Sequence, residues 1–403
     1  MLQIGYVFKE MITIIAILLV SVIIFLFIEY LVHFHHLKSI PVRIHVNGTR
    51  GKSSITRLIA AALREHGMKT YAKTTGTLPR MIMRDGREFP IYRPTGANII
   101  EQLRIVALAA DSKADVLVVE CMALQPYLQS LTELKFIRST HGVITNARAD
   151  HLDVMGPSER DVALALLGTT PRKGILFTGE RDYPNEFASA CRDRKSELRV
   201  VELAEIEAIS DEEISGFSYV EHKENVALAL KVAESLGVPR QVALKGMWNA
   251  RPDFGAMSES EIDFFGRKVM FVNGFAANDP ESSERVWRMS FEKYGHMKKK
   301  IMVLNSRADR PDRSKQLGEA MGEWPRADKY ILIGSGVYVL FKRAVAGGIE
   351  PSRFVYAEGM KVDRIFEEIM AASGKSAMVT GIGNIGGPGI ELVNYFRNRT
   401  TLP

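Results

Sequence analysis

The length and composition of the chain indicate a globular protein with more than one domain. Its 403 residues are 46% hydrophobic and 25% charged, which excludes a wholly disordered or collagen-like chain, and about 150 residues per domain suggests two domains and an appendage. The net charge of +6 is too small to indicate a nucleic-acid-binding protein, whereas a polyanionic ligand or an acidic membrane surface suits it.

The first distinct segment is an apolar run near the N-terminus. Residues 11–28 carry no formal charge, and only Thr13 and Ser21 interrupt the apolar side chains. This length is at the lower end of what spans a bilayer, and no signal-peptide cleavage site is visible. We therefore predict a single-pass anchor in residues 1–36 that contacts membrane lipid; the alternative is a buried hydrophobic helix.

The charges that flank this run predict its orientation in a cell membrane. Lys38 and Arg43 follow it, whereas Lys9 with Glu10 precedes it. Basic residues favour the cytoplasmic side, so the catalytic part is expected there. The two cysteines of the chain cannot build a disulfide framework, which also favours a reducing compartment.

After the anchor, β-rich runs alternate with helical stretches. This rhythm predicts an α/β fold with a largely parallel sheet. The predicted strands are residues 42–46, 115–120, 142–146, 174–178, 268–273, 300–305, 329–334 and 376–381. A polar, proline-containing stretch at 249–261 separates two alternating regions, so we predict an ATP-binding domain at 37–255 and a smaller, Rossmann-like α/β domain at 256–403.

A glycine-containing loop between the first strand and its helix carries the strongest motif. The backbone N–H groups of such a loop cradle phosphates, while a lysine neutralises their charge and a serine approaches Mg²⁺. Val46 holds the position of the first glycine in the usual G-x-x-x-x-G-K-[ST] spacing, and the alternative is a basic turn that opens a helix. The loop residues are Gly48, Thr49, Arg50, Gly51, Lys52, Ser53 and Ser54.

Two further segments supply metal-ligand or base chemistry. Glu120 ends the apolar strand 115–120, at the edge of the sheet where α/β proteins bind ligands, and it is a plausible ligand of Mg²⁺. The alternative is a solvated acid at an exposed strand end. Segment 145–153 also follows a predicted strand and contains Asn146 and His151; a histidine alone is usually structural.

Taken together, these motifs resemble the ATPase core of the Mur ligase superfamily, whose phosphate loop has the shortened Gly-Thr-x-Gly-Lys-[Ser/Thr] form. Segments 73–77, 120–123, 150–157 and 272–279 extend the resemblance over nearly the whole chain. They are similar to those of the ligase subunits of poly-γ-glutamate synthase, the CapB/PgsB family. The resemblance implies ATP and Mg²⁺ as cofactors.

The same resemblance implies roles for individual residues. Lys52, His151 and Arg251 would be catalytic, and Arg251 would reach the γ-phosphate. Ser53, Glu120 and His151 would hold the metal. Asn146 would belong to the nucleotide site, Asn225 would face the adenine, and either Asn273 or Asp279 would hold the ribose. No carbamylated lysine is identified, because Lys173 lies in a predicted turn.

In the second domain, segment 305–313 follows a strand and resembles the Asp/Arg-rich turn of Mur ligase C-terminal domains. Arg307, Asp309 and Arg310 are predicted to bind the substrate, whose carboxylates the two arginines would clamp. The alternative is an ordinary solvated loop.

The resemblance implies a membrane-anchored, ATP-dependent amide ligase. An acyl phosphate on a glutamate carboxylate would be attacked by the amine of the next glutamate, with release of ADP and phosphate. The implied partners are glutamate, the growing poly-γ-glutamate, other membrane subunits of the synthase complex and a second copy of the chain, without nucleic acid. The alternatives are a folylpolyglutamate synthetase-like ligase, a muropeptide ligase, and a non-ligating ATPase or scaffold of an assembly or export complex.

Overall fold

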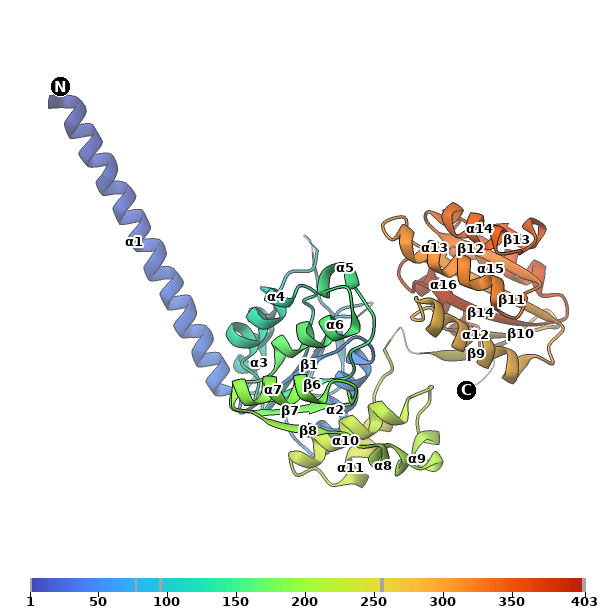
Figure 1. Ribbon diagram of the computed structural model, residues 1–403, viewed down its shortest axis with the longest axis horizontal. Coiled ribbons are helices and arrows are strands. Elements are labelled where there is room, and N and C mark those ends of the chain that lie inside the picture. The colour runs from blue at the N-terminus through green and yellow to red at the C-terminus, as the bar shows by residue number, and fades with distance from the viewer. Residues whose placement is uncertain (1, 77, 94–95, 254–256, 401–403) are drawn as a thin grey trace. The chain divides into compact units, whose positions relative to one another are not determined.

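The computed structural model describes residues 2–76, 78–93, 96–253 and 257–400, and the chain forms two compact units (Figure 1). The first comprises Met1–Gly216 and His222–Arg251, and the second comprises Phe217–Glu221 and Pro252–Pro403. Each unit is built of helices around one β-sheet. The predicted α/β class is therefore confirmed, while the predicted domain limits at 36/37 and 255/256 stay a prediction.

The apolar N-terminal segment belongs to α1 (Leu2–Ser39), a single helix of 38 residues that extends away from the sheet of the first unit (Figure 1). From Met11 to Ser39 this helix is long and apolar enough to cross a membrane, and its most apolar stretch has no part buried inside the structure. The alternative of a buried hydrophobic helix is therefore wrong, because no protein atoms cover the apolar run.

Arg43 ties the end of α1 to the first unit. Its guanidinium donates hydrogen bonds to the carbonyl oxygens of Leu37 (2.9 Å), Ile40 (2.5 Å), Ile137 (3.2 Å) and Arg138 (2.9 and 3.1 Å). Leu37 and Ile40 are also buried in a hydrophobic cluster of this unit. The last turn of α1 is thus held by both packing and hydrogen bonds.

The sheet of the first unit has eight strands in the order β4-β3-β2-β5-β1-β6-β7-β8. They are β1 (Val42–Asn47), β2 (Thr70–Thr74), β3 (Arg80–Ile82), β4 (Glu88–Pro90), β5 (Val116–Glu120), β6 (His141–Ile144), β7 (Ile175–Thr178) and β8 (Glu197–Val200). Only the pairs β2–β3 and β3–β4 are antiparallel. The prediction of a largely parallel sheet is confirmed, and β1, β5, β6 and β7 lie within two residues of the predicted ranges.

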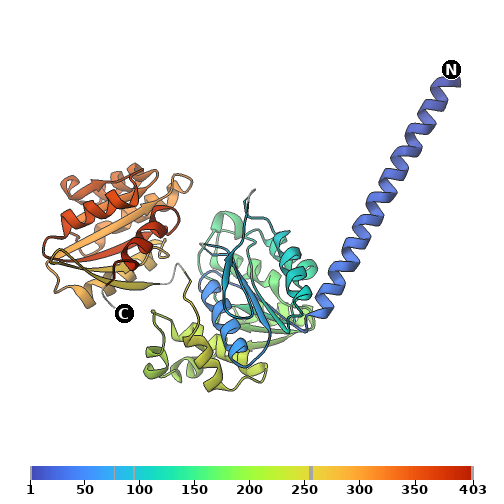
Figure 2. The ribbon, with the colours of Figure 1, turned by 180° about the vertical axis from the view of Figure 1, so that it is seen from behind.

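Helices cover both faces of this sheet. The helices of one face include α6 and α7, which lie in front of the sheet in Figure 1, whereas α2 lies in front of it in Figure 2. The helices of this unit after α1 are α2 (Lys52–Glu65), α3 (Glu101–Asp111), α4 (Pro126–Leu131), the π-helix η1 (Thr132–Ile137), α5 (Leu152–Met155), α6 (Glu159–Leu166), the 3₁₀ helix η2 (Leu167–Thr169), α7 (Pro184–Arg194), α8 (Leu203–Glu207), α9 (Asp211–Ser215), α10 (Lys223–Ser235) and α11 (Arg240–Trp248).

The second unit has a six-stranded mixed sheet in the order β13-β12-β11-β14-β10-β9. Its strands are β9 (Ser258–Phe264), β10 (Arg267–Asn273), β11 (Lys299–Ser306), β12 (Lys329–Gly334), β13 (Phe354–Tyr356) and β14 (Ser376–Gly383). Only β9 is antiparallel to its neighbour. The four strands predicted for this region are β10, β11, β12 and β14.

Two hydrophobic clusters place the helices of the second unit in three layers with the sheet. One cluster contains Trp287 of α12, and the other contains Phe396 of α16, whose ring stacks on Phe271 of β10 with centroids 4.1 Å apart. The helices of this unit are α12 (Pro280–Tyr294), α13 (Pro311–Ala320), the 3₁₀ helix η3 (Met321–Glu323), α14 (Val337–Ala346), the 3₁₀ helix η4 (Pro351–Arg353), α15 (Val362–Ser373) and α16 (Pro388–Arg397).

A buried ion pair lies beneath the central strand of the first unit. His45 of β1 is fully buried, and its Nδ1 lies 2.8 Å from Oε2 of Glu133. The other carboxylate oxygen of Glu133 accepts hydrogen bonds from the amide and hydroxyl of Ser139, each 2.9 Å long. Burial alone lowers the pKa of His45, but the interactions with Cys121 and Glu133 outweigh it and raise the pKa to about 9.

We predict that this pair makes stability depend on pH. Because the pKa of His45 is raised from 6.5 to about 9 on folding, its contribution is complete below pH 6.5 and is lost as the pH rises toward 9. The free energy of unfolding in urea should fall by about 3 kcal/mol over this window. Glu133→Gln removes the carboxylate and should flatten this part of the curve. Parallel curves for the two proteins would contradict the assignment.

Candidate active site

The carboxyl ends of neighbouring parallel strands bring the predicted site residues to one edge of the first sheet. β1 lies between β5 and β6, with Val46 opposite Glu120 and Asn47 opposite Ile144. The phosphate loop, Glu120 and the segment that begins at Thr145 therefore leave the sheet side by side. This is the edge at which open α/β sheets bind ligands.

Two glycines give the phosphate loop its conformation. Gly48 has φ = 132° and Gly51 has φ = 79°, values that side-chain-bearing residues rarely adopt. A Cβ on Gly48 would come within 1.9 Å of Thr145 Oγ1, and one on Gly51 within 2.9 Å of Asn225 Oδ1. Gly51 caps α2, whose first N–H groups have no acceptor within the helix. The predicted loop between strand and helix is thus present.

Asn146 holds the loop from the neighbouring strand. Its carbonyl oxygen accepts a hydrogen bond from the amide of Thr49 (3.0 Å), and its side-chain Oδ1 accepts from the amide of Arg50 (3.1 Å). Its Nδ2 donates to the carbonyl of Arg50 (3.2 Å), and Thr145 Oγ1 donates to the same carbonyl (2.6 Å). Asn146 therefore shapes the phosphate loop, and its predicted contact with nucleotide stays a prediction.

Lys52 and Ser53, in the first turn of α2, face different partners. The ammonium of Lys52 donates to the carbonyl oxygens of Gly48 (2.5 Å) and Thr49 (3.2 Å), which holds it against the loop. The hydroxyl of Ser53 donates to Oε2 of Glu120 at 2.8 Å. The residue order Gly-Lys-Ser thus places an ammonium and a hydroxyl–carboxylate pair at the same helix N-terminus. Ser54 follows within the helix.

Glu120 is buried, with 3% of its surface exposed. Its Oε2 accepts hydrogen bonds from Ser53 Oγ and from the amide of Thr75 (2.7 Å). The alternative of a solvated acid at an exposed strand end is therefore wrong. Burial arises because β5 is a central strand, covered on both sides by β1 and β2.

Lys73 is a site residue to which the sequence assigned no role. It is completely buried at the end of β2, and its Nζ lies 2.9 Å from Oε1 of Glu101. Arg93 donates to both oxygens of Glu101 at 2.6 and 2.9 Å. Burial lowers the pKa of Lys73, while Glu101 and Glu120 oppose the shift. A lysine within a short β-rich run, Thr70–Thr74, is the signal that could have identified it.

Glu180, after β7, was also missed. Its Oε2 accepts from the amide of Ala147 at 2.7 Å, and its Oε1 accepts from the amides of Arg181 and Asp182, both at 2.8 Å. It thereby fixes the start of the segment that contains His151. A carboxylate two residues after a buried strand is the available sequence signal.

His151 and Asp150 lie at the start of α5. His151 has a left-handed φ of 49°, and its Nε2 is 3.9 Å from Asp150 Oδ1. Among the described residues no group of three or more His, Cys, Asp or Glu side chains could hold a metal ion. A protein-only cage is therefore absent from this part of the chain, and the role of His151 as a ligand stays a prediction.

The two remaining predicted residues of the first unit come from its C-terminal part. Asn225 lies in the first turn of α10 with its Oδ1 against Gly51, so it borders the phosphate loop. Arg251 follows α11 and is exposed; its carbonyl accepts a 3.5 Å hydrogen bond from Arg57. The structure thus brings Asn225 to the loop, and the predicted contacts of both residues with ATP stay predictions.

In the second unit, Asn273 and Asp279 already have structural partners. Asn273 is buried at the end of β10, where its amide group bonds Ser258 Oγ and the amide of Phe275, both at 3.4 Å. Asp279 caps α12 by accepting a hydrogen bond from the amide of Ser282 at 2.9 Å. Asp279 is the more accessible of the two, and the ribose contact of either residue stays a prediction.

The charged turn after β11 is exposed on the second unit. Arg307 donates to both carboxylate oxygens of Asp309 at 2.9 and 2.7 Å, and this hydrogen bonding lowers the pKa of Asp309. Arg310 is half-buried at the start of α13, and its side chain makes no ion pair with any residue in the described ranges. A substrate carboxylate would have to displace Asp309 in order to bind Arg307, whereas it could bind Arg310 without displacing a carboxylate.

Comparison with known proteins assigns the chain to a family. The model for the poly-γ-glutamate synthase CapB C-terminal domain matches residues 260–399, and the model for the Mur ligase middle domain matches 46–233. The capsule biosynthesis protein CapB of Bacillus anthracis is 39% identical over 96% of this chain and 82% of that protein. The PGA synthase CapB of Bacillus subtilis (strain 168) is 36% identical over 91% of this chain and 93% of its own length. The chain belongs to the CapB family.

Solved structures show the same fold at low sequence identity. Escherichia coli FolC, in a complex with DHPP and ADP, superposes with a TM-score of 0.68 and 16% identity over 91% of each chain. The CapB-family chain therefore has a Mur ligase-like α/β fold, as the resemblance implied. Its phosphate loop and Glu120 lie within the matched middle domain.

We predict that Gly48→Ala lowers affinity for ATP at least about tenfold. The added Cβ would collide with Thr145 Oγ1 at 1.9 Å, so the loop must open, and a left-handed backbone adds strain of about 1–2 kcal/mol. The control is Gly86→Ala, since Gly86 also has positive φ but no atom within 4 Å of the new Cβ. ATP titration by calorimetry should separate the two variants. Wild-type affinity in Gly48→Ala would contradict the proposed loop.

Proposed function

We propose that the chain is an ATP-dependent amide ligase that joins glutamate residues into poly-γ-glutamate. The observation that carries the proposal is the phosphate loop braced by Asn146, in a chain of the CapB family. The related CapB of B. subtilis is described as a PGA synthase. Family membership thus supplies the substrate class, and the loop supplies the means of using ATP.

The nucleotide phosphates would bind at the N-terminus of α2. There the helix dipole and the first N–H groups of the helix favour negative charge. Lys52 lies in this turn and would transfer its hydrogen bonds from the carbonyls of Gly48 and Thr49 to the phosphates. Arg251 would add a second positive charge at the γ-phosphate.

The donor set near the loop fits a divalent metal. Ser53 Oγ and Glu120 Oε2 are hard oxygen donors that already lie 2.8 Å apart. Mg²⁺ is commonly bound through one or two protein oxygens, with the remaining positions filled by phosphates and water, so a protein-only cage is not required. Ser53 and Glu120, with His151, would hold Mg²⁺, which when bound neutralises charge on the phosphates.

The reaction consists of two transfers. A carboxylate oxygen at the chain end attacks the γ-phosphorus of ATP, the bond to the β-phosphate oxygen breaks, and ADP leaves. The amine of the next glutamate then attacks the acyl carbon, loses a proton and forms the amide as phosphate departs. The chain's residues contribute mainly by orienting the reactants and neutralising charge.

The incoming glutamate would be held by the charged turn of the second unit. Glutamate carries two carboxylates, which need positive partners, and arginine binds carboxylates through two parallel hydrogen bonds. Arg310 is the better candidate, because Asp309 already occupies the guanidinium of Arg307. Asp309 would then orient Arg307 rather than bind substrate.

We further propose that α1 anchors the enzyme in the cell membrane. The stretch from Met11 to Ser39 has the length and composition of a membrane span, and signal sequences share these properties. The basic residues after the apolar run favour a cytoplasmic catalytic part. Other membrane subunits of a synthase complex and a second copy of the chain are the further partners that this location would allow.

We predict that Lys52→Ala folds but loses ATP turnover by roughly 100-fold, the range found when one charge-stabilising donor is removed. Its side chain bonds only carbonyls of the loop among the described residues. The control is Lys69→Ala, an exposed lysine that precedes β2. ADP release is measured with and without glutamate and poly-γ-glutamate. Glutamate-independent turnover in the wild type would indicate the non-ligating ATPase, and normal turnover in Lys52→Ala would exclude the proposed loop function.

We predict that Arg310→Ala raises the apparent KM for glutamate about tenfold while the KM for ATP stays within about twofold, because one charged hydrogen-bonding partner is lost. Arg307→Ala is the comparison, and it should have a smaller effect because Arg307 is paired with Asp309. Steady-state kinetics with each substrate varied provides both constants. A changed KM for ATP with an unchanged KM for glutamate would place this turn in the nucleotide site instead.

A further inference from the structure

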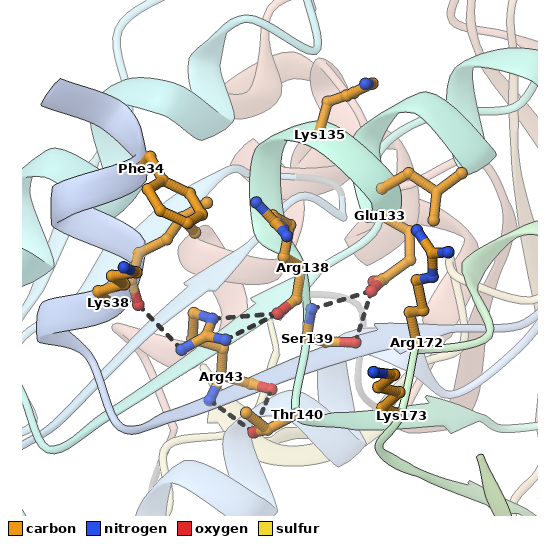
Figure 3. A pocket seen from close by; sticks show the side chains of 12 residues that line it. Phe34, Lys38, Arg43, Glu133, Lys135, Arg138, Ser139, Thr140, Arg172 and Lys173 are labelled. Carbon is orange, nitrogen blue, oxygen red and sulfur yellow. Dashed lines mark hydrogen bonds between the residues drawn. The ribbon is translucent and has the colours of Figure 1, made fainter. Parts of the chain in front are cut away.

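A pocket of about 650 Å³ lies at the opposite edge of the first sheet from the phosphate loop. Its walls are the last turn of α1, the π-helix η1, the turn at 138–140 and the turn at 172–173 (Figure 3). These segments precede β1, β6 and β7, whereas the phosphate loop follows β1. The pocket is therefore separate from the proposed catalytic edge.

The exposed side chains that line this pocket are positively charged. Among the described residues none of the five exposed cations forms an ion pair. They are Lys38, Lys135, Arg138, Arg172 and Lys173. The one acid in the wall, Glu133, is 1% exposed and already bonds His45 and Ser139. The pocket thus presents a net positive charge without an internal counter-ion.

The backbone shapes the pocket around two of these cations. Arg138 has φ = 48° and Lys173 has φ = 58°, a left-handed conformation that glycine adopts more readily than side-chain-bearing residues. A charged side chain nevertheless occupies both positions. Arg43, also in the wall, bonds backbone carbonyls of α1 and of the η1 turn, so it shapes the pocket rather than offering its charge.

The pocket lies at the depth of the lipid headgroups if α1 spans the membrane. The exposed apolar run of α1 ends at Val32, and at about 1.5 Å per residue Lys38 lies about 9 Å farther along the helix. Phe34 lies one turn before Lys38. The Nζ of Lys38 is 4.5 Å from the centre of the Phe34 ring, and the guanidinium of Arg138 is 5.0 Å from it. Aromatic rings with adjacent cations are typical of the membrane–water interface.

We propose that this pocket binds the headgroup phosphate of an anionic phospholipid. The lipid would belong to the leaflet on the side of the membrane where the first unit lies. The inference rests on the proposed anchoring by α1. A lipid fits better than a soluble polyanion, because one wall of the pocket is the apolar helix itself and a headgroup phosphate is already at that depth. Lys135 and Arg138 would bind it from one side, and Arg172 and Lys173 from the other.

The test uses the full chain in lipid nanodiscs that contain equal amounts of phosphatidylglycerol and phosphatidylcholine. Native mass spectrometry measures which lipid stays bound to the protein after the protein is released from the nanodisc. The wild type should retain phosphatidylglycerol preferentially. Lys135→Gln/Arg138→Gln should reduce this retention about 25-fold, at about fivefold per cation removed, and Arg172→Gln/Lys173→Gln should reduce it similarly. The charge-matched control is Lys342→Gln/Lys375→Gln, two exposed lysines of the second unit, and it should behave as wild type.

Two further measurements separate the possible failures. Flotation with vesicles of phosphatidylcholine alone reports insertion of α1, and circular dichroism reports folding of each variant. A wild type that does not float overturns both the anchoring and the lipid site. A wild type that floats but shows no lipid preference, or variants that keep it, overturns the lipid site alone. Displacement of bound lipid by millimolar inorganic phosphate or by poly-γ-glutamate would assign the pocket to a soluble anion instead.

Discussion

The bonds between Asn146 and the phosphate loop are the constraint on which the catalytic edge depends. A loop that must receive several negative charges needs N–H groups that point outward, and such a loop cannot satisfy its own backbone. Asn146 bonds the backbone of Thr49 and Arg50, which fixes the entry to α2. The first amides of that helix are then directed at a common point. Two strands are required for this arrangement, since one carries the loop and the other carries its brace.

The two ends of the strands in the sheet of the first unit bear different groups of residues. Glu120, Lys73 and the phosphate loop gather where the strands end, whereas the end of α1 and the cationic pocket lie where they begin. Arg43 joins α1 to this sheet, because it lies in β1 and its guanidinium donates hydrogen bonds to the carbonyl oxygens at the end of α1. An enzyme built this way would keep its nucleotide site one sheet length away from the membrane surface, which leaves the site open to soluble ATP and glutamate.

Local patterns in the sequence predicted much of this fold. The alternation of apolar strands and helices located β1, β5, β6 and β7, and the Gly-Lys-Ser order identified the loop between β1 and α2. The family resemblance is also confirmed.

Tertiary features were not predicted. The burial of Glu120 depends on the central position of β5 in the sheet. The residues of a single strand do not determine which strands pair with it. The pairing of Lys73 with Glu101 joins residues 28 positions apart, and the cations of the pocket come from four separate segments. The expectation for Arg307 omitted Asp309 as its partner, although the two are neighbours in the sequence.

The transfer of oxygen from the chain-end carboxylate of poly-γ-glutamate to phosphate tests the central claim most directly. Poly-γ-glutamate and glutamate, both labelled with ¹⁸O in their carboxylates, are incubated with the full chain, ATP and Mg²⁺, and the released phosphate is analysed by mass spectrometry. If an acyl phosphate forms, the oxygen that bridged carbon and phosphorus leaves with the phosphate, so each new amide bond should yield one phosphate that carries one ¹⁸O atom. Phosphate that takes its new oxygen from solvent water, with no label from a carboxylate, would show that the loop hydrolyses ATP without activating a carboxylate and would contradict the account.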